Sequence, residues 1–173
     1  SAHGEWRYQL IASPGQLGRQ PFSVTDIAFM PSGSGGLLCS LFEVRMSHTT
    51  VKPSTLFAVN LPNPTTVFVT TNSGWATSAN AWSPIGLQNL FNYDGTSGLT
   101  IEIRYTGGTL RGAFRGTCLG LNSPHGAYRI GAQSTGSFNA ASGTNWNQSG
   151  LAFRLTVVRA LITPAGTGGI GTT

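Results

Sequence analysis

The chain carries few acidic groups that could serve as catalysts. Its five carboxylates are Glu5, Asp26, Glu43, Asp94 and Glu102. Glu43 and Glu102 fall at outward positions of two predicted strands, as the paired acids of β-sandwich glycosidases do. Each glutamate alternates along its strand with an arginine on the same face, Arg45 or Arg104, so a surface ion pair is the simpler interpretation. We therefore assign no catalytic residue.

The three histidines do not indicate metal or triad chemistry either. His3, His48 and His125 lie far apart in the sequence and form neither an HxH nor an HExxH pair. The sequence holds no GxSxG nucleophile elbow and no phosphate-binding loop. We expect a non-enzymatic protein without a cofactor or a metal site, in which His48 and His125 are hydrogen-bonding groups at strand ends.

Tryptophans offer a binding hypothesis instead. Trp75, Trp82 and Trp146 lie in or beside segments rich in Gly, Ser and Asn, where an exposed indole could stack on a sugar ring. Carbohydrate-binding modules are often β-sandwiches with such a platform. Trp82 is expected to pack into the core, with its indole N–H on a carbonyl group. Trp75 and Trp146 are retained as candidate stacking residues for a polysaccharide.

Two cysteines, Cys39 and Cys118, stand 79 positions apart, and neither has a CxxC neighbour. This spacing excludes a zinc ribbon and a thioredoxin-like motif. In a secreted chain the two could form a disulfide, which would close a loop of about 80 residues and stabilise the fold by about 4 kcal/mol. Two small buried thiols are the alternative, because free cysteine is among the most buried residue types.

The composition is low in charge and rich in hydroxyl and amide groups. Charged residues make up 9% of the 173 residues, against about a quarter in an ordinary soluble domain. Ser, Thr, Asn and Gly account for 72 of the 173 residues, a mixture typical of secreted β-proteins. Residues 1–4 look like the start of a mature chain after removal of a signal peptide. We expect a secreted protein, extracellular or at the cell surface.

The charge distribution argues against nucleic acid as a partner, despite a net charge of +5. Nine of the ten basic residues are arginines, and they are scattered singly along the chain. No apolar run approaches the length of about 18 residues that a transmembrane helix needs. The length suits one domain.

Alternation of apolar and polar residues, the pattern of a strand with one buried face, recurs along the chain. It is clearest at 41–48, 99–106 and 151–157. At 99–106 the expected inward residues are Leu99, Ile101, Ile103 and Tyr105, and the polar residues between them are expected to face outward. Weaker strands are predicted at 6–11, 24–30, 55–60, 65–71, 111–118 and 127–132.

Turn sequences rich in Gly, Pro, Asn and Asp separate these strands, and no segment keeps helical spacing for three turns. The best helical candidate, 85–91, is short and follows Pro84. These features predict an all-β fold, namely a jelly-roll-like antiparallel β-sandwich of about eight to ten strands. We place an N-terminal strand or arm at 1–14, the sandwich domain at 15–163 and a flexible Gly/Thr-rich tail at 164–173.

One segment resembles a known group of proteins. The motif Phe-Asn-Tyr-Asp-Gly-Thr-Ser-Gly-Leu-x-Ile-Glu runs from Phe91 to Glu102. Together with 24–29 and 45–49, it resembles secreted β-sandwich modules of bacterial surface proteins of the Bacteroidetes and Planctomycetes type. The resemblance covers about residues 22–160, implies the same fold and supplies no catalytic residue.

Within this motif, Asn92, Asp94 and Gly95 are expected to form a structural turn. Gly95 would take a positive φ, and the Asp94 side chain would bind backbone amides. A calcium ion held by Asn92 and Asp94 is the alternative. The turn is favoured, because hard cations usually need more than one carboxylate.

The N-terminal strand indicates a function through assembly. Trp6, Tyr8 and Leu10 share one face of a segment that Ser13-Pro14-Gly15 separates from the rest. Such an arm could add to the sheet of a neighbouring subunit. We predict a structural subunit of a self-assembling surface filament, appendage or matrix layer, a homopolymer linked by strand addition. The alternative is a carbohydrate-binding module that uses the loop tryptophans.

Overall fold

The computed structural model describes residues 4–30, 35–50, 53–107, 109–112, 118–119, 128–133, 136–147, 150–151 and 153–159. The strands are β1 (Glu5–Ala12), β2 (Phe22–Phe29), β3 (Gly35–Thr49), β4 (Thr65–Thr77), β5 (Ser83–Pro84), β6 (Phe91–Tyr93), β7 (Gly98–Thr106), β8 (Thr109–Gly112), β9 (Cys118–Leu119), β10 (Tyr128–Gln133), β11 (Thr144–Asn147), β12 (Gly150–Leu151) and β13 (Phe153–Val158). The helices described are the four-residue α1 (Phe57–Asn60) and the 3₁₀ turn η1 (Ser137–Asn139).

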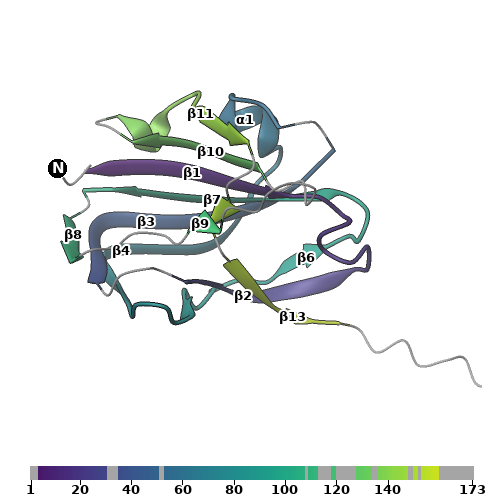
Figure 1. Cartoon of the computed structure of the whole chain (residues 1–173), viewed down its shortest axis with the longest axis horizontal. Helices are drawn as coiled ribbons and strands as arrows, with labels where there is room; N and C mark the ends of the chain where they lie inside the picture. The colour runs from purple at the N-terminus through teal and green to yellow at the C-terminus, as the bar shows by residue number, and fades with distance from the viewer. Residues whose placement is uncertain are drawn as a thin grey trace, which may run out of the picture.

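Two unequal antiparallel sheets form the body of the protein (Figure 1). The large sheet has the order β11-β10-β1-β7-β3-β4, with β8 also paired to β3. The small sheet has the order β13-β2-β5, with β6 also paired to β2, and β9 pairs with β12 separately. The antiparallel β-sandwich predicted from the sequence is confirmed. No helix in the described ranges is long and apolar enough to cross a membrane.

The core lies between the two sheets and follows the alternation of the sequence. On β3 the residues Phe42, Val44 and Met46 are at most 3% exposed. On β7 the four residues predicted to face inward are all buried in the same cluster. β2 contributes Val24 and Ile27 from the small sheet, and both are fully buried. On β3 and β7, period-two patterning therefore identified the inward faces correctly, because successive side chains of a strand point to opposite sides. On β2 an irregularity in the pairing with β13 interrupts the alternation between Val24 and Ile27.

The N-terminal strand is not an arm that leaves the domain. β1 lies between β10 and β7, and all eight of its residues pair with β7. Tyr8 and Leu10 are each 2% exposed and belong to the main core, against which Trp6 packs. The prediction that Trp6, Tyr8 and Leu10 insert into a neighbouring subunit is therefore wrong. The strand already has hydrogen-bonding partners along both edges, so it is part of its own sandwich.

The outer face of the large sheet is covered over β1 and β7. The segment 55–60, predicted as a strand, instead contains the helical turn α1, which lies over this face with the nearby residues 136–143 (Figure 1). Phe57 is fully buried, and its N–H donates to the Ala141 carbonyl at 3.0 Å. Asn60 closes the loop by bonding both the N–H and the carbonyl of Ser54. The local alternation of apolar and polar residues could not distinguish a strand from this helical turn, because the residues that bury Phe57 belong to a distant part of the chain.

The segment 85–91, the best helical candidate of the sequence, is not helical: it is an irregular connection from β5 to β6 that contacts both sheets. The Ile85 N–H donates to the carbonyl of Ile27 on β2 at 2.9 Å. The Gln88 N–H donates to the carbonyl of Val67 on β4, also at 2.9 Å. The side-chain amide of Gln88 bonds both the N–H and the carbonyl of Val69, at 3.0 and 2.9 Å. Gln88 therefore occupies the place of a neighbouring strand along the first half of the β4 edge.

Candidate functional site

The glutamate at the centre of the outer face is engaged on both of its oxygens. Glu102 on β7 is fully buried. Its Oε2 accepts hydrogen bonds from Arg7 Nε and Gln9 Nε2, each at 2.8 Å, and both donors come from the adjacent β1. Its Oε1 accepts from Arg45 on β3, through Nε at 2.9 Å and also through Nη2. Glu102 lies on the outer face of the sheet, as predicted, but it is buried there and not exposed to solvent.

The second glutamate, Glu43 on β3, forms an equivalent contact. Its Oε2 accepts from Arg104 Nε at 2.5 Å. The Glu43–Arg104 and Arg45–Glu102 ion pairs join residues directly opposite each other on β3 and β7, because cross-strand neighbours on one face are closer than residues two apart on one strand. A glycosidase needs a carboxylic acid that a substrate can reach. Here guanidinium groups engage both carboxylates, and Glu102 has no exposed surface, so the pair is structural.

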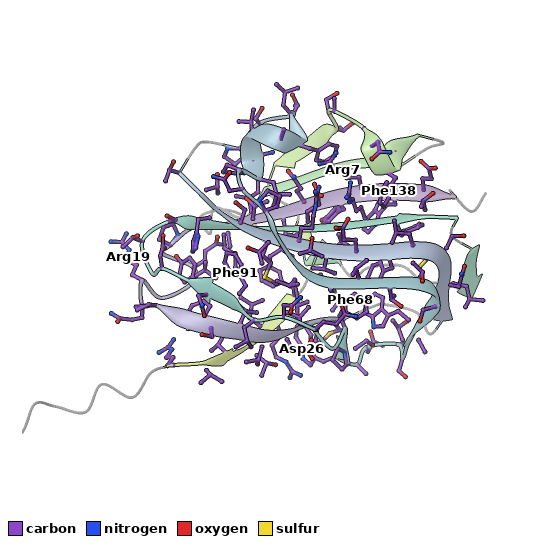
Figure 2. The ribbon with its side chains drawn as sticks, turned by 180° about the vertical axis from the view of Figure 1, so that it is seen from behind. Arg7, Arg19, Asp26, Phe68, Phe91 and Phe138 are labelled. Carbon is purple, nitrogen blue, oxygen red and sulfur yellow. The ribbon has the colours of Figure 1, made fainter. Side chains whose placement is uncertain are left out.

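Two phenyl rings close this polar layer from above. The guanidinium of Arg7 lies 4.5 Å from the ring centroid of Phe57, and that of Arg104 lies 4.2 Å from the ring centroid of Phe138. Figure 2 shows Arg7 and Phe138 close together on the side of the sheet that carries α1. The rings add cation–π attraction and keep water from the guanidinium groups.

A hollow of about 420 Å³ opens at the end of the sandwich where β6 lies, opposite the N-terminus (Figure 1). Its lining residues are Ser47, His48, Pro62, Asn63, Thr65, Leu90, Phe91 and Asn92. The volume lies within the range of small-molecule sites, about 300–1,000 Å³. The lining combines amide, hydroxyl and imidazole groups with the apolar surface of Leu90, which is 59% exposed. We call this the β6 hollow.

A second hollow of about 300 Å³ adjoins the ends of β1 and β3 and the start of β7. Its lining residues are Ile11, Ala12, Ser13, Pro14, Thr49, Thr50, Pro53, Thr96, Ser97 and Gly98. We call this the β1 hollow. The two hollows share no lining residue. They are adjacent on β3, where His48 lines the β6 hollow and the next residue, Thr49, lines the β1 hollow.

His48 lines the β6 hollow and also binds the turn at Asp94. Its Nε2 accepts the N–H of Asp94 at 3.1 Å and lies 3.9 Å from Asp94 Oδ2. Its ring packs against those of Phe91 and Tyr93, with centroids 4.9 and 6.0 Å away. The prediction that His48 is a hydrogen-bonding group near a strand end is confirmed. His125 lies outside the described residues.

The turn predicted at Asp94 and Gly95 is confirmed. Asp94 Oδ1 accepts the N–H groups of Thr96 and Ser97, each at 2.8 Å, and Oδ2 accepts the Ser97 hydroxyl at 2.7 Å. Burial raises the pKa of this carboxyl, but the bonds from Ser97 and Thr96 outweigh it and lower the pKa to about 2. Gly95 has a φ of +80°, and an added Cβ would lie 2.7 Å from Pro21 N.

Asn92 does not belong to the turn itself. It lies on β6, and its Oδ1 accepts the hydroxyl of Ser23 on β2 at 2.7 Å. Both Asp94 oxygens accept hydrogen bonds within the turn, which favours the turn over the calcium alternative. Within the described part of the chain, no group of three or more His, Cys, Asp or Glu side chains could hold a metal ion.

The tryptophans do not form a platform that the structure describes. Trp75 on β4 stacks on Phe42, with centroids 6.3 Å apart and an interplanar angle of 13°. Its indole N–H donates to the Pro84 carbonyl at 2.9 Å, and the pit beside it measures only about 50 Å³. Trp82 is half-buried and lies 5.1 Å from the guanidinium of Arg154. The side chain of Trp146, on β11, lies outside the described residues.

The predicted disulfide is not present at Cys39. This residue is a free cysteine, 6% exposed, and its thiol donates to the Ser73 carbonyl at 3.7 Å. Burial raises the pKa of the thiol. Cys39 therefore takes the alternative role, that of a small buried thiol, and the side chain of Cys118 lies outside the described residues.

Sequence reasoning missed most of the β6 hollow. Asn63, just before β4, Thr65, at its start, and Leu90, directly before β6, carry no motif. One signal was available, because Asn63 stands between two prolines and has a φ of +48°, a backbone conformation in which asparagine is enriched. Comparisons with protein-family models, curated proteins and solved structures find no match. The resemblance to secreted bacterial surface modules therefore stays a prediction.

Proposed function

We propose that this protein is a non-enzymatic carbohydrate-binding module whose site is the β6 hollow, not the loop tryptophans. One observation carries the proposal. The hollow of about 420 Å³ presents Asn63, Asn92, Thr65 and His48 beside the exposed apolar surface of Leu90. Amides, hydroxyls and imidazole donate and accept hydrogen bonds, as the hydroxyl groups of a sugar require. An apolar side chain beside them suits the C–H face of a sugar ring. We propose in addition that the protein acts outside the cell.

The test is binding of defined polysaccharides by the full chain. We expect retardation in native affinity gels containing hydroxyethyl cellulose, xylan or galactomannan. Leu90→Ser should abolish the shift, because it removes the exposed apolar contact. Leu56→Ser is the matched control, since Leu56 is also an exposed leucine, 49% against 59%, but lies beside α1. A folded wild-type protein that binds none of these polymers would refute the proposal, as would equal effects of the two variants.

Self-assembly is the second candidate, now through a different strand. β4 is the outermost strand of the large sheet, and its 13 residues include no charged residue and no proline. Charges and prolines are common means of preventing edge-to-edge pairing. Gln88 covers β4 at Val67 and Val69, so a second copy would pair beyond this point, along 70–77.

Sedimentation velocity at rising concentration tests this second candidate. We expect a dimer of the wild-type chain, because pairing β4 with β4 of a second copy uses the same edge on both copies. Thr71→Lys should be a monomer, since it places a charge on the exposed edge. Ala58→Lys, on the exposed side of α1, is the matched control and should assemble normally. A wild-type monomer at millimolar concentration would exclude the candidate.

A further inference from the structure

We propose that the β6 and β1 hollows are two subsites of one extended binding site, and that its ligand is an uncharged sugar chain lying across the Asp94 turn. This inference rests on the proposed function and names the ligand class. Both hollows lie at the same end of the sandwich. Asn92 lines the β6 hollow, whereas Thr96 and Ser97 line the β1 hollow, so the Asp94 turn joins their walls.

The turn between the subsites is held rigidly. Three hydrogen bonds of 2.7–2.8 Å fasten the Asp94 carboxylate to Thr96 and Ser97. The Asp94 N–H is in turn bound by His48 on β3. Gly95 packs so closely on residues 20–21 that a Cβ there would lie 2.7 Å from backbone. A rigid turn suits an extended ligand, because the protein loses little conformational entropy when the ligand binds.

A buried hydroxyl points to a ligand in the second subsite. Thr49 lines the β1 hollow and is 5% exposed. Its Oγ1 makes no hydrogen bond to any part of the chain that the structure describes. A buried hydroxyl without a partner is costly, by about 1–3 kcal/mol. Rotation of the Thr49 side chain about χ1 toward a ligand hydroxyl in this hollow would give Oγ1 a hydrogen-bond partner.

The charges indicate that the ligand is uncharged. His48 is the one titratable side chain among the described residues that line either hollow, and no arginine or lysine is among them. Asp94, between the two, carries a negative charge at neutral pH because its pKa is about 2. An acidic polysaccharide would be repelled by this carboxylate and would find no cation in the lining.

Binding of oligosaccharides of increasing length tests the two-subsite arrangement. The probes are cello-, xylo- and manno-oligosaccharides of one to six units, measured by calorimetry on the full chain. We expect affinity to rise with length until both hollows are filled. Thr49→Val and Thr96→Ala should lower the affinity for the longest probe about tenfold each, the effect of one lost hydrogen bond, and leave binding of the shortest bound probe unchanged. Leu90→Ser should weaken both.

The outcomes separate this inference from the proposed function. If no sugar binds, the proposed function fails and this inference fails with it. If sugars bind with an affinity independent of length, and Thr49→Val and Thr96→Ala have no effect, only the two-subsite arrangement is refuted. Tighter binding of polygalacturonate than of the neutral chains would refute the uncharged ligand. Circular dichroism of each variant verifies that the fold is retained.

Discussion

Replacing Glu102 with glutamine would test whether the buried polar layer holds α1 and η1 on the sheet. The carboxylate is fully buried and binds two guanidinium groups and the Gln9 amide. Glutamine has nearly the same shape, so the substitution removes the charge and leaves the packing almost intact. Arg7 and Arg45, whose side chains are only 11% and 17% exposed, would then lack a counter-ion.

The expected cost is about 3–5 kcal/mol, the usual range when one partner of a buried ion pair is removed. Glu43→Gln is the matched control, because Glu43 is 12% exposed and pairs with a single arginine, Arg104. It should cost about 1 kcal/mol, as partly solvated pairs do. For a chain of this length, the larger loss corresponds to a fall in Tm of about 10 °C.

Urea unfolding followed by tryptophan fluorescence measures both variants. A double-mutant cycle with Arg45→Met isolates the Glu102–Arg45 term, which should exceed about 1 kcal/mol. The reasoning would be refuted if Glu102→Gln cost less than about 1 kcal/mol, or no more than Glu43→Gln. Either result would mean that the aromatic cover, rather than the ion pairs, holds the layer together.

Three further predictions concern the turn and the thiol. Gly95→Ala should lower the free energy of unfolding, measured in urea titrations, by about 2–4 kcal/mol, because φ is +80° and the new Cβ would lie 2.7 Å from a backbone atom. An effect below about 1 kcal/mol would contradict this close packing. The Asp94 pKa is about 2 in the folded protein, below its ordinary 3.8, so the carboxylate stabilises the fold above about pH 4 and this contribution is lost as the pH falls toward 2. In Asp94→Asn, the free energy of unfolding should therefore fall less steeply between pH 4 and 2 than in the wild type. The difference should be about 1 kcal/mol, because solvent screens a side chain that is 38% exposed. An unchanged slope would show that the hydrogen bonds of the turn do not affect the ionisation of Asp94. In a Cys118→Ser background, Cys39 should react with Ellman's reagent only after unfolding, because it is 6% exposed and burial raises its thiol pKa, and rapid labelling of the native protein would disagree with the structure.

Some features could be read from the residues alone because they depend on local geometry. Val44 and Ile103 face the core because each alternates with polar neighbours along a strand. Gly95 takes a positive φ, and Asp94 binds the amides that follow, because these residue types form this turn wherever the chain reverses. The sequence by itself thus determined the fold class, the inward faces of the main strands and the structural turn.

Other features depend on which distant segments meet, and the tertiary structure alone decided them. The segment with Trp6, Tyr8 and Leu10 has the same alternation in an arm as in a central strand, and only its pairing with β7 and β10 distinguishes the two. Glu102 lies on a face that the pattern marks as outward, yet it is buried because Phe57, some 45 residues away in sequence, lies over its neighbour Arg7. The β6 hollow likewise combines Asn63, Leu90 and His48 from segments that no periodicity connects, since a concave surface depends on how strand ends and loops pack together.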